Sequence, residues 1–325
     1  MNKLKKRSAL SRVVTRFLDH KRTLGRRYLH EAWVLQKLLR HVEQSNCRDL
    51  NARCFGSWLA SLKNHHPNTR GKWYQIVRHF CVYRRRIEPG CFLPSVEGAA
   101  KGQPYVTPVI MEPNQIGRML ALASKLPKTT ASPLRAPVLR LAIVLLYTSG
   151  LRLGELLRLT LGDIEEQGTL LRIRESKFHK SRLVPLSPSA TRELHVYLRK
   201  RRRDFAADPS TPLLCNNEGR YLHPYTHTGL RSAIGQLFDA AAIRDEQGRR
   251  PRVHDLRHSF AVQALLRWYR NGADVQSCLP KLAIYMGHVS IVSSAHYLHC
   301  IPALQRLASG RFEQRFGHLI DGGGQ

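Results

Sequence analysis

Five side chains between residues 152 and 297 are of types that can act together on a phosphate group. Arg152 stands in TSGLRLGELL, and His254 and Arg257 stand three residues apart in HDLRHSFA. Residues at that spacing share one helix face, so both can reach a single anion. His288 follows a glycine in YMGHVS, and Tyr297 comes nine residues later in AHYLHC. The set supplies two guanidinium groups, two imidazoles and one phenol.

These groups match the needs of an in-line attack on a phosphodiester. Such an attack requires a nucleophile and stabilisation of the charge on the non-bridging oxygens. A free tyrosine has a pKa of about 10, so Tyr297 would need nearby cations to stabilise its phenolate and an imidazole to accept its proton. Arg152 and Arg257 each offer a planar fork to phosphate oxygens. With His288 donating as well, we expect a reaction that needs no metal ion.

The same region of the sequence also offers a lysine to this set. Lys177 lies in RESKFHKSRLVPL, in the turn between two β-rich segments, and Lys180 and Lys281 are alternatives. Each candidate taken singly also has an ordinary explanation: a solvated lysine, a helix-capping arginine, or a half-buried tyrosine. The prediction therefore depends on the order and spacing of the whole set.

The elements that must position these residues are mainly helical. Ser132 followed by Pro133 predicts a helix start, with Ser132 as N-cap, and the helix that runs on to residue 149 is apolar nearly all round, which indicates a buried central helix. Residues 162–185 change to a short β period and predict a small antiparallel sheet. Further helices are expected at 113–124, 189–203, 226–242, 255–270, 275–286, 290–298 and 303–316.

The first hundred residues also predict helices, at 11–24, 28–44, 51–63 and 69–86, before prolines and glycines break the pattern. We therefore expect a mainly α chain with a small antiparallel sheet (α+β). Its domains are predicted at 1–100 and 111–325, joined by a linker at 101–110.

The charge of the chain points to a polyanionic partner. Fifty-three Lys and Arg residues against 23 Asp and Glu give a net charge of +30. Such an excess repels itself unless a polyanion binds, and nucleic acid is the first candidate. The predicted DNA-binding side chains lie on the fourth helix and in the hairpin: Lys72, Arg78, Arg84, Arg85, Lys180 and Arg182.

Other features narrow the class of protein. The seven cysteines form no Cys-x-x-Cys pair and are odd in number, which predicts reduced thiols in a cytosolic protein. No His and Cys pattern suits tetrahedral zinc, and no apolar run approaches the ~20 residues of a membrane span. We expect no metal, no cofactor and no membrane partner, and a cytoplasmic, nucleoid-associated location.

Arg, a hairpin Lys, His-x-x-Arg, Gly-His and then Tyr, in this order, resemble the tyrosine recombinase (phage integrase) family across residues 140–300. The resemblance implies a helical core-binding, SAM-like DNA-binding domain at 1–100 and a catalytic domain at 111–325. It implies that Tyr297 forms a 3′-phosphotyrosine, that Lys177 protonates the 5′ oxygen and that His254 is the acid–base partner of the tyrosine. Lys177 is preferred to Lys180 because of its distance from Val184-Pro185-Leu186.

The implied function is site-specific cleavage and rejoining of double-stranded DNA, for integration, excision or transposition of a mobile element. The residues after Tyr297, with Pro302 and a helix at 303–316, look more like transposon-borne recombinases. The family further implies a homotetramer on paired recombination sites, with possible accessory DNA-binding proteins.

Two other functions stay open at this point. A type IB topoisomerase uses similar chemistry without choosing a site, and a DNA-binding protein could carry the same fold without activity. Two other tyrosines could compete as nucleophile. Tyr285 precedes His288 within a predicted helix and looks like a core residue, and Tyr269 would point away from the face of His254 and Arg257.

Overall fold

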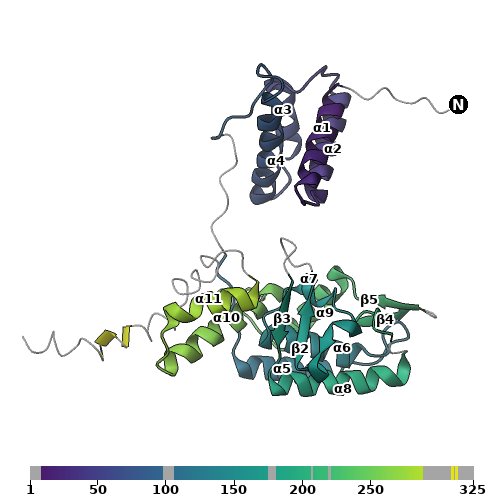
Figure 1. Cartoon of the computed structure of the whole chain (residues 1–325), viewed down its shortest axis with the longest axis vertical. Helices are drawn as coiled ribbons and strands as arrows, with labels where there is room; N and C mark the ends of the chain where they lie inside the picture. Colours follow the sequence, from purple (N-terminus) through teal and green to yellow (C-terminus); the bar gives the residue numbers. More distant parts are fainter. Residues whose placement is uncertain are drawn as a thin grey trace, which may run out of the picture. The chain divides into compact units, whose positions relative to one another are not determined.

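The computed structural model describes residues 9–97, 106–174, 181–205, 208–218, 221–287, 309–310 and 312–313. The chain divides into two compact units, Met1–Val106 and Thr107–Gln325 (Figure 1). Each unit has its own hydrophobic core. The architecture is mainly helical with small antiparallel sheets, which confirms the predicted fold class.

Between residues 9 and 97, the first unit consists of four helices. They are α1 (Ala9–Thr23), α2 (Leu29–Gln44), α3 (Ala52–Ser61) and α4 (Pro67–Arg85). Each helix agrees with the range predicted from apolar periodicity to within two residues at either end. Asn51 caps α3, because its side chain accepts a hydrogen bond from the backbone nitrogen of Cys54 at 2.8 Å. Phe17 and Phe80 meet edge to face in the core between α1 and α4.

The second unit combines seven helices and five short strands in the part of it that the structure describes. The helices are α5 (Pro113–Ser124), α6 (Arg135–Thr148), α7 (Leu153–Leu156), α8 (Pro188–Asp204), α9 (His227–Ala240), α10 (Val253–Arg270) and α11 (Val275–Met286). The strands are β1 (Ile164–Glu165), β2 (Leu170–Ile173), β3 (Arg182–Pro185), β4 (Cys215–Glu218) and β5 (Tyr221–Pro224), with 3₁₀ turns at Leu161–Asp163 and Glu166–Gly168.

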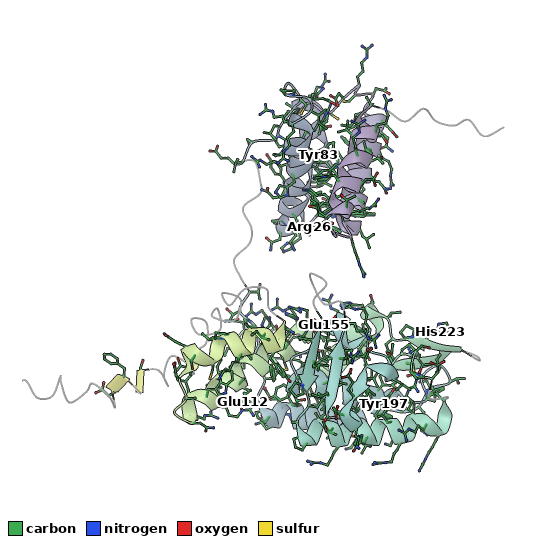
Figure 2. All side chains as sticks on the ribbon, in the orientation of Figure 1. Arg26, Tyr83, Glu112, Glu155, Tyr197 and His223 are labelled. Carbon is green, nitrogen blue, oxygen red and sulfur yellow. The ribbon has the colours of Figure 1, made fainter. Side chains whose placement is uncertain are left out.

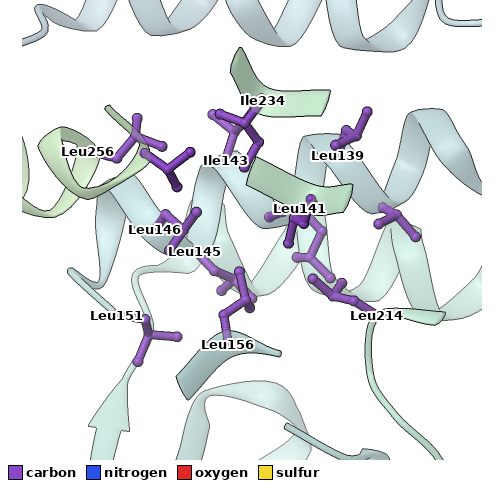
Figure 3. Close-up of a cluster of buried hydrophobic side chains, with 14 of the residues drawn as sticks. Leu139, Leu141, Ile143, Leu145, Leu146, Leu151, Leu156, Leu214, Ile234 and Leu256 are labelled. Atoms are coloured by element: carbon purple, nitrogen blue, oxygen red, sulfur yellow. The ribbon is translucent and has the colours of Figure 1, made fainter. Parts of the chain in front are cut away.

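Helix α6 forms the centre of this unit and contacts α5, α8, α9 and α10. Figure 3 shows its apolar side chains, such as Leu145, clustered with Leu156, Ile234 and Leu256 from the surrounding helices. A fully buried leucine contributes about 1.5–3 kcal/mol to folding, so this cluster holds the neighbouring helices firmly. The predicted buried central helix is confirmed.

The start of α6 differs from the prediction. The helix begins at Arg135 with Leu134 at the N-cap, so the assignment of Ser132 as N-cap was wrong. The Ser132 backbone pairs with Thr129 in an isolated bridge, and its hydroxyl lies 2.5 Å from the phenol oxygen of Tyr225. A tertiary hydrogen bond therefore takes the side chain that a local cap would have used.

The predicted small sheet is present as β1-β2-β3, with every pairing antiparallel. Leu171 and Val184 stand opposite each other on the core face, whereas Arg172 and Leu183 are exposed, as the two-residue period of a strand requires. The β4–β5 hairpin was not predicted. Its first strand, CNNE, contains no β-branched or aromatic residue, so nothing local indicates a strand there.

Candidate active site

Two arginines that lie 105 positions apart in the chain both bond to backbone carbonyls at the end of α11. Arg257, on α10, donates from Nη1 to the carbonyl oxygen of Gly150 at 2.5 Å and from Nη2 to that of Met286 at 2.6 Å. Arg152, at the N-cap of α7, donates from Nη2 to the carbonyl oxygen of Gly287 at 2.8 Å. The loop before α7, the start of α10 and the end of α11 are thereby fixed together.

The backbone conformation at two positions of this arrangement, 150 and 287, requires glycine. Gly150 has φ +60°, and a Cβ there would lie 2.5 Å from the ring of Phe260. Gly287 has φ +64°, and a Cβ there would lie 2.8 Å from Nη1 of Arg182. Only glycine adopts this left-handed conformation without strain or a clash. The turns at these positions aim the two carbonyl oxygens at Arg257 and Arg152.

Glu155, labelled in Figure 2, is the buried anion of the site. Its carboxylate accepts hydrogen bonds from Nη1 of Arg152 at 2.7 Å and from the Arg152 backbone nitrogen at 3.0 Å. Arg182, on β3, donates to the same carboxylate at 3.0 and 3.2 Å. Burial raises the pKa of Glu155, but the hydrogen bonds from Arg182 and Arg152 outweigh it and bring the pKa to about 2. The sequence reasoning missed Glu155, although its capping-box spacing from Arg152 was visible.

Substitution of Glu155 by glutamine should lower the free energy of unfolding by about 3 kcal/mol, because it removes the buried charge that pairs with Arg182 and Arg152. The loss should be measured by urea unfolding at pH 7. A carboxylate with a lowered pKa stabilises the fold above its unfolded pKa, so the difference from wild type should shrink as pH falls from about 4.5 toward about 2.

The matched control is Glu193→Gln, which breaks the bidentate pair with Arg140 between α8 and α6. That pair is more exposed, at 17 % for Glu193 against 2 % for Glu155, so its loss should cost less. Equal losses for the two variants would contradict a special role for Glu155.

His254 lies at the start of α10, beside both arginines. Desolvation lowers the pKa of His254, although part of its ring faces solvent, and the positive charge of Arg257 and then of Arg152 lowers it further. The ring also meets His258 edge to face, with centroids 4.7 Å apart. A neutral imidazole at pH 7 can accept a proton, which is the property that a general base needs.

A basic cavity of about 350 Å³ opens beside these residues. Its lining consists of Arg152, Leu153, Gly154, His227, Arg231, Arg252, Val253 and His254. Sequence reasoning did not single out His227, Arg231 and Arg252, because no motif marks them. The i, i+4 spacing of His227 and Arg231 at a helix start was the only available signal. The cavity can accept an anionic group and surround it with guanidinium and imidazole donors.

Other predicted site residues lie outside the described residues: Lys177, Lys180, His288 and Tyr297. Of the alternatives, Lys281 is exposed on α11. The Tyr285 hydroxyl donates to the carbonyl oxygen of Pro185 at 3.0 Å, and burial raises the pKa of Tyr285 to about 12. A phenol in this state is a poor nucleophile, which argues against Tyr285 as the attacking residue.

Two of the predicted DNA-binding residues have structural partners. Arg84 is 7 % exposed and pairs with both carboxylate oxygens of Asp49 at 2.7 Å and with Glu88 at 2.6 Å. Arg182 has an 11 % exposed side chain and pairs with Glu155. Arg84 is buried in its internal ion pairs and cannot reach a phosphate, so its assignment as a DNA contact is corrected. Arg182 is half-buried, and its ion pair with Glu155 argues against its assignment as a DNA contact.

The remaining basic candidates of the first unit are accessible. Lys72 and Arg85 are exposed, and Arg78 is half-buried. Lys72 lines a hollow of about 680 Å³ that also contains Arg26 and His79. This surface offers positive charge and is open to solvent, as a contact with a DNA backbone requires.

No metal-binding group is formed in the part of the chain that the structure describes: no three His, Cys, Asp or Glu side chains are placed to hold an ion. Nor is any helix within the described ranges both long enough and apolar enough to cross a membrane.

A model of the phage integrase family matches residues 110–302. Among curated proteins, the chain is 30 % identical to the putative integrase/recombinase y4rB of Sinorhizobium fredii over 312 residues, covering 95 % of this chain and 98 % of that protein. It is 32 % identical to the tyrosine recombinase XerD of Caulobacter vibrioides over 239 residues, covering 72 % and 71 % of the two chains.

Two solved structures share the fold at low sequence identity. The Tn1549 transposon integrase in complex with transposon right end DNA gives a TM-score of 0.64 at 16 % identity and covers 93 % of this chain and 98 % of that one. The XerH site-specific recombinase bound to a palindromic difH substrate gives a TM-score of 0.61 at 19 % identity, covering 86 % and 78 % of the two chains.

Proposed function

Because this chain belongs to the phage integrase family and is a tyrosine recombinase, we propose that it cleaves and rejoins DNA through a covalent bond to Tyr297. One observation carries the proposal for this site: Arg152 and Arg257 both bond to carbonyls at the end of α11, and Arg152 and His254 line one basic cavity. That arrangement suits a phosphate held by preorganised donors.

In the proposed reaction, Arg152, Arg257 and His288 stabilise charge on the non-bridging oxygens of the scissile phosphate. The phenol oxygen of Tyr297 forms a bond to phosphorus as the bond to the 5′ oxygen breaks. His254 accepts the phenol proton, and Lys177 gives a proton to the departing oxygen, which leaves as a 5′-hydroxyl. The phosphotyrosine retains the free energy of the phosphodiester, so a second 5′-hydroxyl can attack it and reseal the strand without ATP.

The Lys177→Ala variant should cleave ordinary DNA much more slowly than wild type. It should cleave a substrate with a 5′-bridging sulfur at close to the wild-type rate. A thiolate leaves without protonation, so such a substrate needs no acid. Single-turnover cleavage on both substrates measures this. Lys180→Ala, three residues further along the chain, is the control and should show no substrate-dependent difference. Failure of sulfur to rescue Lys177→Ala would assign the acid to another residue.

We further propose that the DNA is a recombination site of a mobile element and that a homotetramer on two paired sites carries out exchange. Complexes of the Tn1549 integrase and XerH with DNA support the DNA partner. Lys72, Arg78 and Arg85 would contact the DNA backbone from the first unit. Accessory DNA-binding proteins and a cytoplasmic, nucleoid-associated location belong to the same proposal.

The proposal is tested with purified protein, EDTA and nicked, end-labelled DNA from the flanks of its own gene. A protease-sensitive, slowly migrating band on a denaturing gel is the expected result. Relaxation of an unrelated supercoiled plasmid, with no band on any flank, would favour a type IB topoisomerase instead. Salt-sensitive binding with neither activity would favour a DNA-binding protein without catalysis.

A further inference from the structure

Strand β3 and the end of α11 are joined by two reciprocal side-chain-to-backbone hydrogen bonds. The Nε of Arg182, the first residue of β3, donates to the backbone carbonyl of Tyr285 at 2.9 Å. The hydroxyl of Tyr285 donates in return to the backbone carbonyl of Pro185, the last residue of β3, at 3.0 Å. Each element thus contributes one side chain and one carbonyl, and we call this pair of bonds the β3–α11 clasp.

Arg182 also extends the clasp to a third segment. Its two Nη atoms hold the carboxylate of Glu155, which is 2 % exposed and bonded to Arg152. Its guanidinium packs so closely on Gly287 that a Cβ there would lie 2.8 Å from Nη1. One half-buried side chain of a four-residue strand therefore contacts α7 and the end of α11 at once.

The place of these contacts in the sequence indicates what they do. Arg182 comes five residues after Lys177 and is the first residue of β3, and Gly287 immediately precedes His288. Strand β3 pairs on one side with β2 alone among the described strands, so the sheet itself does little to fix its position relative to α11. The clasp supplies that constraint.

We propose that Arg182 is a positioning residue: through the clasp it couples the strand that follows Lys177 in the chain to the segment that contains Arg152 and to the end of α11, which precedes His288. This inference rests on the proposed function. In this proposal, the position of the leaving-group acid depends on the end of α11. The acid and the residues that bind the phosphate would then keep a fixed position relative to each other.

Arg182→Met should cleave ordinary DNA about 100-fold more slowly than wild type, because a displacement of about 1 Å at a reacting group costs that much. If the displaced group is the acid, a 5′-bridging sulfur substrate should restore most of the rate. Tyr285→Phe keeps the ring stacked on Phe260 but loses the bond to Pro185, and should show the same pattern with a smaller loss. Tyr285→Phe tests the same proposal if Arg182→Met does not fold.

The matched control is Arg140→Met, which breaks a bidentate ion pair in the same unit away from the site. Its rates on both substrates should equal those of wild type. An equal loss on both substrates for folded Arg182→Met would mean that Arg182 acts only through Arg152 and Glu155, which overturns the coupling. Wild-type rates on ordinary DNA would overturn it as well.

Hydrogen exchange tests the coupling without relying on activity. In both Arg182→Met and Tyr285→Phe, amide exchange should accelerate in β3 and at the end of α11 together. Acceleration confined to the element that carries the substitution would contradict the clasp. A wild-type chain that forms no covalent DNA would refute the proposed function, while the exchange result would still decide whether the two elements are coupled.

Discussion

Tyr297→Phe is expected to abolish covalent capture of DNA while changing DNA affinity by less than about twofold. The substitution removes one hydroxyl, which is the proposed nucleophile, and leaves the ring and every basic contact in place. DNA affinity comes mainly from phosphate neutralisation by a chain that carries a net charge of +30. Denaturing gels should report the capture, and a titration at fixed salt should report the affinity.

The matched control is Tyr285→Phe, twelve residues earlier in the chain. It should still capture DNA covalently, although more slowly than wild type because the bond to Pro185 is lost, since the raised pKa of Tyr285, about 12, makes it a poor nucleophile. Covalent DNA on Tyr297→Phe, together with none on Tyr285→Phe, would transfer the nucleophile to Tyr285.

Arg257→Ala is expected to slow cleavage by about 10²–10³, the usual effect of removing one preorganised donor to a developing oxyanion. The loss has a second source in this fold, since Arg257 also holds the carbonyls of Gly150 and Met286, which belong to the segments that carry Arg152 and His288. Arg257→Lys should recover little of the rate, because one ammonium cannot span both carbonyls as a planar fork does.

Single-turnover cleavage at saturating DNA separates this loss from weaker binding, and circular dichroism checks the fold. Arg270→Ala removes an exposed arginine from the last turn of the same helix and should leave the rate unchanged. A rate for Arg257→Ala within tenfold of wild type would remove Arg257 from the proposed site.

The fold could be predicted from sequence wherever local pattern and tertiary packing agree. In the helices of the first unit, the spacing of apolar residues shows which face is buried. In α6, the nearly continuous apolar sequence shows that the whole helix is buried. The start of α6 could not be predicted, because Ser132 bonds to Tyr225, which comes 93 residues later. Strand β4 could not be predicted either, because only its pairing with β5 makes CNNE a strand.

In the candidate site, too, the residues marked by local spacing could be predicted, and those that depend on distant partners could not. Order and spacing selected Arg152, His254 and Arg257, and the structure brings these three together. Glu155 was missed because its importance arises from Arg182, 27 residues away. Arg84 was assigned to DNA because nothing near it in sequence predicts that Asp49, 35 residues earlier, pairs with it. Burial of a charge depends on its tertiary partner, which spacing alone does not reveal.

The most direct test of the account is to identify the amino acid that becomes bonded to DNA. Wild-type protein is incubated with nicked site DNA in EDTA, the trapped complex is digested with nuclease and protease, and the nucleotide-modified peptide is sequenced by mass spectrometry. The account predicts a phosphate adduct on Tyr297, formed without divalent metal. An adduct on any other residue, or one formed only when a divalent metal is present, would contradict it.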